Sequence, residues 1–458
     1  MRIKIHFISL LPVLFALFLF SCVSKKTQKI SSELGVVSNS AKFEEIELKS
    51  DAILMDRGNS NNVLLAQLEG GLAAYHNKNY EKALGLFTSA DEQLTNLYFK
   101  AEVDVKQTFA EYFNKSTNRP YIGNMHDKFN VCAYALLCCL GKKDFSQARI
   151  WSNKIIHASE MANELYEKRI SKIHNFKKLS SSQISKTKNK LRELHPELYE
   201  IEIYQDFINP FALGLAVCMK SSDLNDPNGI EEASQILKTL QKKTSLKWPA
   251  IMESKINKKL QSGSRDITKI IIVSGGTIKL KKPYQASLML TSGKEHLVEY
   301  KSIANLESGT SFNKEFGPNF NLMSNNDFIA VDSFLKANET FAGKIHTESL
   351  KISQNFDKAN RSMGGSENRS QLIAGPFDML AKSMYSLVEL GASTTPADLR
   401  GWNSLPKEHH IAIGSPIDDL ELNLEGRLMN SCKEVPNFDL LHIRPTKSHD
   451  HIHHFSLN

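Results

Sequence analysis

The chain has 458 residues, of which 41% are hydrophobic and 23% are charged, a balance typical of folded proteins, and the length favours two domains. Its formal net charge of +7 is spread along a sequence in which basic residues alternate with acids, whereas nucleic-acid-binding domains gather Lys and Arg on one stripe. The composition therefore argues against a nucleic-acid partner.

The first 21 residues have the organisation of an export signal. Arg2 and Lys4 precede an apolar run at residues 7–20, and Cys22 follows at once. Residues 19–22 (LFSC) resemble a lipobox, in which the chain is cut before a cysteine that carries lipid, although Phe20 is bulkier than the usual residue there. An uncleaved transmembrane helix is the alternative, but the run is shorter than the roughly 20 residues that a bilayer needs. We therefore expect residues 1–21 to be removed and Cys22 to carry the lipid.

Residues 22–61 are expected to form a lipid-anchored tether, because residues 23–50 are rich in Ser, Lys and Glu with little apolar periodicity. The acyl chains of a lipoprotein hold it stably at a membrane, since each buried methylene contributes about 0.8 kcal/mol. Val23, rather than an aspartate, follows the lipidated cysteine, and by the sorting rule of Gram-negative lipoproteins this predicts the outer membrane. We expect a bacterial cell-envelope protein that faces the periplasm.

Residues 62–261 are expected to form a tetratricopeptide-like (TPR-like) helical superhelix, because apolar residues recur at spacings of three and four. In the first hairpin, small residues allow two helices to approach closely and larger ones fill the seam to the next helix. The repeat-packing residues predicted in this way are Gly71, Tyr80, Ala83, Phe87 and Ala90.

Two further hairpins repeat the pattern less regularly. The second includes Phe145 and Ala148, and the third, after a turn at residues 226–229, includes Ala233. A solenoid of this type commonly binds a peptide or a protein in its groove. A compact helical body without a ligand is the alternative.

Without Cys22, five cysteines remain, so they cannot all pair within one chain. Cys132, Cys138, Cys139 and Cys218 lie in apolar helical stretches, where free cysteine packs as a small hydrophobic residue.

Residues 262–445 are expected to form an α+β domain that is rich in strands. Residues 267–273, 277–280, 284–290, 297–300, 410–413, 420–424 and 440–443 have strand-like patterns, and residues 332–353 and 377–390 indicate a helical insertion. This predicts a mostly antiparallel sheet or sandwich interrupted by helices.

Residues 446–458 form a histidine-rich tail in which His449, His451, His453 and His454 are weak candidates for metal ligands. A flexible terminus usually lacks the outer hydrogen bonds that orient ligating histidines. We therefore expect a solvated tail with no metal and no cofactor.

The sequence contains none of the common catalytic motifs: a GxSxG elbow, HExxH, a Walker A loop or a dinucleotide-binding GxGxxG after a strand. No catalytic residue is assigned, and enzymatic activity stays open.

Two stretches, residues 118–129 (NRPYIGNMHDKF) and residues 397–406 (ADLRGWNSLP), are similar to signatures of a family of uncharacterised tetratricopeptide-like bacterial lipoproteins. The likeness covers most of residues 60–425, and it implies architecture and anchoring, because the family has no established activity. Read physically, Asp398, Arg400, Trp402 and Tyr121 predict a clasp between domains, with a ligand site as the alternative.

These patterns predict an envelope lipoprotein whose TPR-like domain mediates protein–protein interaction. Its expected partners are the membrane, through the N-terminal lipid, and an unknown envelope protein or peptide. The alternatives are an enzyme acting on envelope polymers and a purely structural spacer.

Overall fold

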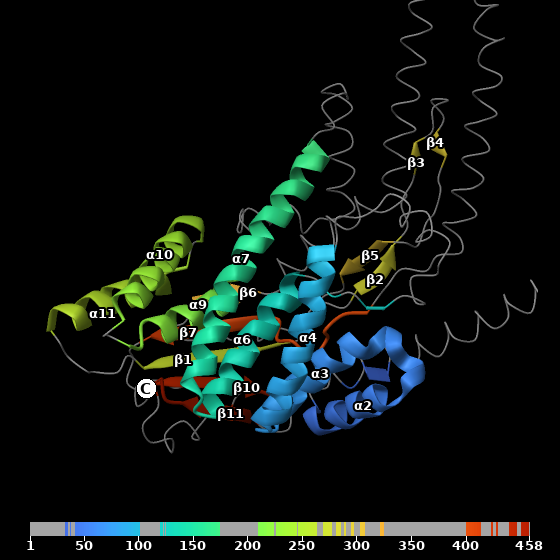
Figure 1. Cartoon of the computed structure of the whole chain (residues 1–458), viewed down its shortest axis with the longest axis horizontal. Coiled ribbons are helices and arrows are strands. Elements are labelled where there is room, and N and C mark those ends of the chain that lie inside the picture. The colour runs from blue at the N-terminus through green and yellow to red at the C-terminus, as the bar shows by residue number, and fades with distance from the viewer. Residues whose placement is uncertain are drawn as a thin grey trace, which may run out of the picture.

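The structure, a computed structural model, is a mixed α+β fold that is mostly helical and contains one small sheet (Figure 1). It describes most of residues 42–100, 125–174, 209–262, 269–276, 400–413 and 439–457, with short pieces elsewhere. The described helices are α2 (Phe43–Met55), the 3-10 helix η1 (Arg57–Asn62), α3 (Val63–His76), α4 (Tyr80–Lys100), α6 (Met125–Gly141), α7 (Phe145–His174), α9 (Pro210–Lys220), α10 (Pro227–Lys243) and α11 (Trp248–Ser262).

Helices α3–α4, α6–α7 and α9–α10 pack as three successive hairpins. The first two hairpins share one turn, in which Lys78 and Lys143 both have positive φ (62° and 59°). In each turn the next residue, Asn79 or Asp144, donates its amide to the carbonyl five residues back, and its side-chain oxygen accepts an amide of the following helix. The same residue thus closes one helix and caps the next, so the local structure itself is repeated.

Two glycines allow close helix packing. A Cβ on Gly71 of α3 would lie 2.7 Å from the ring of Phe87 in α4, and one on Gly141 would lie 2.6 Å from the ring of Tyr80. Any larger side chain at either position would displace an aromatic ring that is packed in the core.

The main sheet has five strands in the order β11-β10-β1-β7-β6. Strand β1 pairs parallel with β10, and the other neighbours pair antiparallel. The strands are β1 (Ile270–Gly275), β6 (Asn321–Ser324), β7 (Glu408–Ile413), β10 (Leu440–Pro445) and β11 (Asp450–Phe455). Short two-stranded pairs are formed by β2 (Lys281–Tyr284) with β5 (Ile303–Leu306), β3 (Leu288–Met289) with β4 (Glu295–His296), and β8 (Asn423–Leu424) with β9 (Arg427–Leu428).

One hydrophobic core joins the helices to the sheet. The first helix of each hairpin, α3, α6 or α9, is buried along almost its whole length, because it packs on the second helix of its own hairpin and on the sheet. Rings on these helices, Tyr75, Tyr134 and Phe211, each lie within 6.3 Å of the His442 ring of β10. The change from helix to strand near residue 262 is therefore not a boundary between separate cores.

The expected tether is wrong for its second half. Helix α2 packs on α3, and it buries Phe43, Ile46 and Ile53, which follow one another at spacings of three and seven residues. This is the periodicity of an amphipathic helix, which the Ser, Lys and Glu content of residues 23–50 obscures in the sequence.

The expected solvated tail is also wrong. Residues 450–455 form the edge strand β11, which pairs along its whole length with β10. His453 is only 1% exposed, whereas His454 points outward and is exposed. Strand pairing satisfies the backbone, and the alternation of the strand then buries every second side chain.

Several expectations lie outside the described residues: the signal peptide with Cys22, the helices at 332–353 and 377–390, Asp398 and His449. Among the residues that are described, no helix is long and apolar enough to cross a membrane.

Candidate functional site

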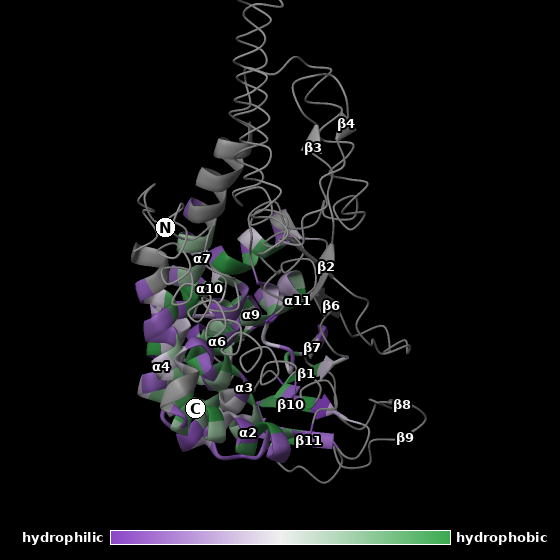
Figure 2. Cartoon of the chain, turned by 90° about the vertical axis from the view of Figure 1, so that its right-hand side faces the viewer, coloured by the Kyte–Doolittle hydropathy of each residue, from purple (hydrophilic) through white to green (hydrophobic). Residues whose placement is uncertain are grey.

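The sheet presents polar side chains to the helices where an apolar face is the usual arrangement. His442 and Arg444 lie on one face of β10, and their partners in register on β11 are His453 and His451. On the same side, Ser274 of β1 is paired with His409 of β7. Figure 2 shows β11 coloured mostly as hydrophilic beside the more hydrophobic β10. We call the residues that meet here the polar layer: His76, Ser274, His409, His442, Arg444 and His453, all of them at most 3% exposed.

A continuous chain of hydrogen bonds runs through the polar layer from helix α3 to strand β7. The Tyr75 hydroxyl lies 2.7 Å from His442 Nδ1, His442 Nε2 lies 2.7 Å from Ser274 Oγ, and Ser274 Oγ lies 2.7 Å from His409 Nδ1. Neutral groups satisfy all three bonds when Tyr75 donates to His442, His442 donates to Ser274, and Ser274 donates to His409. The network therefore ties the helices to the sheet without any buried charge of its own.

The histidines of the layer are held neutral. Burial, followed by the charge of Arg444, lowers the pKa of His442 to about 3. Burial also lowers the pKa values of His76, His409 and His453 well below their usual range, and neighbouring histidines act in the same direction. Removing water and placing other basic groups nearby both disfavour the imidazolium.

Aromatic rings enclose these histidines. The Phe211 ring stacks on His409 with centroids 3.7 Å apart and an angle of 5° between the planes. Tyr75 stacks on His453 at 4.3 Å, and Phe43 of α2 lies 4.2 Å from His76. Both ring nitrogens of His76 lack a hydrogen-bond partner. The enclosure explains why α2 and β11, expected to be tether and tail, are held in place.

Among the described residues, Arg444 is the one cation at the centre of the layer. It is 3% exposed, and its Nη2 donates to the carbonyl of Ser404 at 3.3 Å. Its Nε and Nη1 have no hydrogen-bond partner, and none of the described residues forms an ion pair with it. Burial lowers the pKa of Arg444 to about 10, so its side chain is charged at neutral pH.

The loop that covers this region contains the described part of the predicted clasp. Arg400 donates to the backbone oxygen of Asn61 at 3.0 Å and lies 5.8 Å from the centre of the Tyr121 ring. The Tyr121 hydroxyl donates to Asp127 at 2.9 Å. Trp402 is buried between Phe87 and Tyr134, at 6.0 and 6.3 Å. The structure thus brings Arg400 and Tyr121 together beside the start of α3, and it places Trp402 deeper in the core.

The predicted repeat-packing residues are buried or partly buried. Tyr80 also reaches the polar layer, where its hydroxyl is 2.9 Å from His453 Nδ1. Phe145 is partly buried against the core. Fully buried members of the set are Ala83, Phe87, Ala90, Ala148 and Ala233.

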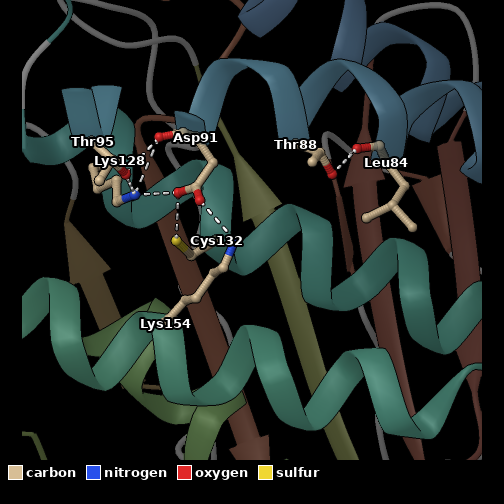
Figure 3. A network of polar contacts seen from close by, with 7 residues as sticks. All are labelled: Leu84, Thr88, Asp91, Thr95, Lys128, Cys132 and Lys154. Atoms are coloured by element: carbon tan, nitrogen blue, oxygen red, sulfur yellow. Dashed lines mark hydrogen bonds and ion pairs between the residues drawn. The ribbon is translucent and has the colours of Figure 1, made fainter. Parts of the chain in front are cut away.

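A second polar cluster joins helices α4, α6 and α7 (Figure 3). The carboxylate of Asp91 contacts the ammonium groups of Lys128 and Lys154 and accepts a weak bond from Cys132 Sγ at 3.6 Å. Lys128 also donates to Thr95 at 2.5 Å. Burial tends to raise the pKa of Asp91, but the Lys128 charge and the bonds from both lysines lower it overall. The cluster fixes the register of three helices.

The four cysteines that the structure describes are buried, as the sequence predicts. Cys132, Cys138, Cys139 and Cys218 are free and buried, and burial raises the pKa of each thiol. They pack as hydrophobic residues and are poor nucleophiles.

The polar layer was missed by sequence reasoning. Its members come from five elements. The available signal was the two-residue spacing between His442 and Arg444 and between His451 and His453, which places each pair on one face of its strand. Of its histidines, only His453 is a candidate metal ligand from the sequence. No group of three or more histidine, cysteine or acidic side chains among the described residues is arranged to hold a metal ion.

No protein-family model, curated protein or solved structure matches the chain. Its function must therefore be inferred from its own residues. Ser274 between two histidines has the composition of a nucleophile with a base, yet its side chain is fully buried and a substrate cannot reach it in this arrangement. The layer is suited to holding groups in place and to offering hydrogen-bond donors.

Proposed function

We propose that this protein is a lipid-anchored binding protein of the bacterial cell envelope, attached through Cys22 to the outer membrane and facing the periplasm. In this proposal, the helical hairpins form a short TPR-like superhelix. The observation that carries it is the repeated turn at Lys78 and Lys143, because repeated helical hairpins are a common scaffold for protein recognition.

The partner surface differs from the usual groove. The inner helices α3, α6 and α9 are covered by the chain's own sheet, so an envelope protein or peptide meets the outer helices α4, α7 and α10. These helices carry exposed residues at helical spacing, for example Ile150 on α7, which is 47% exposed. An enzyme acting on envelope polymers is disfavoured by the closure around Ser274, and a spacer requires no such repeat.

Photo-crosslinking in cells tests the interaction. A photo-reactive residue is placed at Ile150 or Gln235, on the outer faces of α7 and α10, and at Leu48 on α2 as a control for exposure. We expect one discrete adduct from the two outer-helix positions and none from Leu48. Equal smears from all three positions, or no adduct, would contradict the proposal.

Lipid attachment is tested separately with labelled palmitate. We expect label on the wild-type chain, loss of label with release from the membrane in Cys22→Ala, and no change in Cys218→Ala, which alters a buried free cysteine. Label that persists in Cys22→Ala would overturn the anchor.

A further inference from the structure

Arg444 lacks a counterion although it lies deep in the core. Its exposure is 3%, its single bond is to a neutral carbonyl, and two of its three guanidinium nitrogens have no partner. Removing one partner of a buried ion pair typically costs about 3–5 kcal/mol, because the remaining charge is unpaired. A folded chain that keeps such a charge without a use for it is unexpected.

The ionisable groups around Arg444 do not compensate its positive charge. The ionisable groups that influence it or respond to it are His76, His409, His442 and Tyr134, all neutral at pH 7. Lys78 acts on His453 from the rim of the layer. None of these groups is an anion. The buried carboxylate of Glu69 lies beside the loop, where it accepts the amides of Asn403 and Ser404, and it forms no ion pair with Arg444.

Unused hydrogen-bond donors lie on the loop that Arg444 contacts and on helix α3. Ser404, whose carbonyl accepts from Arg444, has a buried hydroxyl without a partner, and the indole Nε1 of Trp402, two residues earlier in the same loop, is also unpaired. His76, which is influenced by Arg444, has two unpaired nitrogens. An ordered water can satisfy such donors, but it leaves the guanidinium charge uncompensated.

We propose that Arg444 and the unused donors beside it bind one oxyanion, a carboxylate or a phosphate group, between the helices and the sheet. The planar guanidinium matches the oxygen geometry of both groups. Trp402 and Ser404, on the loop at residues 400–406, add neutral donors, and the ring of His76 adds one more. This site is independent of the protein partner proposed above.

Closure of the site determines how the anion is held. The unused atoms of Arg444, Trp402 and Ser404 have almost no contact with solvent, so the anion enters when the loop or the edge strand β11 opens and then stays resident. Its effect is therefore seen in the stability of the folded chain, because a ligand that binds only the folded state stabilises it.

Thermal melting of the full, detergent-purified chain tests the site. Melting is recorded in inorganic phosphate, in acetate and in chloride at equal ionic strength, after long equilibration. At about ten times the dissociation constant, a bound anion raises the melting temperature by roughly 1.5 °C in a protein of this size. We expect this rise in phosphate or in acetate relative to chloride, and the anion that is effective identifies the source.

Two variants make the test specific. In Arg444→Met, which keeps the length and removes the charge, the anion-dependent rise disappears, and the melting temperature in chloride equals or exceeds that of the wild type. In Arg149→Met, which removes an exposed arginine paired with Asp223, the rise is retained.

Two results would overturn the proposal. The first is an equal rise in Arg444→Met. The second is the absence of a rise in the wild type with either anion, which leaves water as the occupant; a loss of stability in Arg444→Met would then indicate a purely structural arginine. If Arg444→Met does not fold, the wild-type titration alone decides.

Discussion

Acid should unfold this protein at an unusually mild pH, because four histidines of the polar layer are buried in the neutral form. His76, His409, His442 and His453 have pKa values held far below that of the unfolded chain, which is about 6.5. Below pH 6.5 the unfolded chain binds protons that the folded chain does not, so stability is fully present above this pH and is lost as the pH falls.

The size of the effect follows from linkage. At pH 5.5, one pH unit below the unfolded pKa, each such histidine lowers the free energy of unfolding by on the order of 1 to 2 kcal/mol. Four of them give a loss on the order of 5 to 6 kcal/mol, which is comparable to the whole stability of many domains at about 5–15 kcal/mol. Asp91, whose pKa is lowered from 3.8, contributes below this window and does not obscure it.

The measurement is urea unfolding followed by circular dichroism at pH 7.5, 6.5 and 5.5. His76→Phe provides a matched variant, since both nitrogens of His76 are unpaired and its ring packs on Phe43. This variant should lose about a quarter less stability between pH 7.5 and 5.5, whereas His157→Phe, at a side chain that is 62% exposed, should behave as the wild type. Equal stability of the wild type at pH 7.5 and 5.5 would refute the reasoning.

Two further predictions concern the helices. Asp91→Asn should lower the free energy of unfolding by about 3–5 kcal/mol in urea unfolding at neutral pH, because the buried ammonium of Lys128 loses its counterion; a loss below 1 kcal/mol would mean that Lys128 finds another partner. Gly71→Ala should cost about 1–3 kcal/mol, since its Cβ would lie 2.7 Å from the Phe87 ring. Gly85→Ala, where a Cβ meets nothing within 4 Å, should raise the free energy of unfolding by about 0.5–1 kcal/mol. If both glycine variants changed the free energy of unfolding in the same direction, the packing described for α3 and α4 would be contradicted.

Much of the local structure follows from the sequence. Short-range periodicity placed the hairpins at their observed positions, and the β-branched run of β1 predicted a buried strand. Local signals work here because each depends on residues a few positions apart, such as the apolar spacings of three and four that predict the first hairpin. The lipid anchor at Cys22 stays a prediction from the sequence.

Only the tertiary structure decided what the polar residues do. His442, Arg444 and Ser274 are distant in the chain from Tyr75 and His76, and strand pairing together with helix packing brings them into one buried layer. The same pairing turned the expected histidine tail into an edge strand, and the core contacts of Phe43 turned half of the expected tether into a helix. Composition describes how a segment interacts with water, whereas burial depends on which distant surface is available to cover it, and that surface is defined only when the chain is folded.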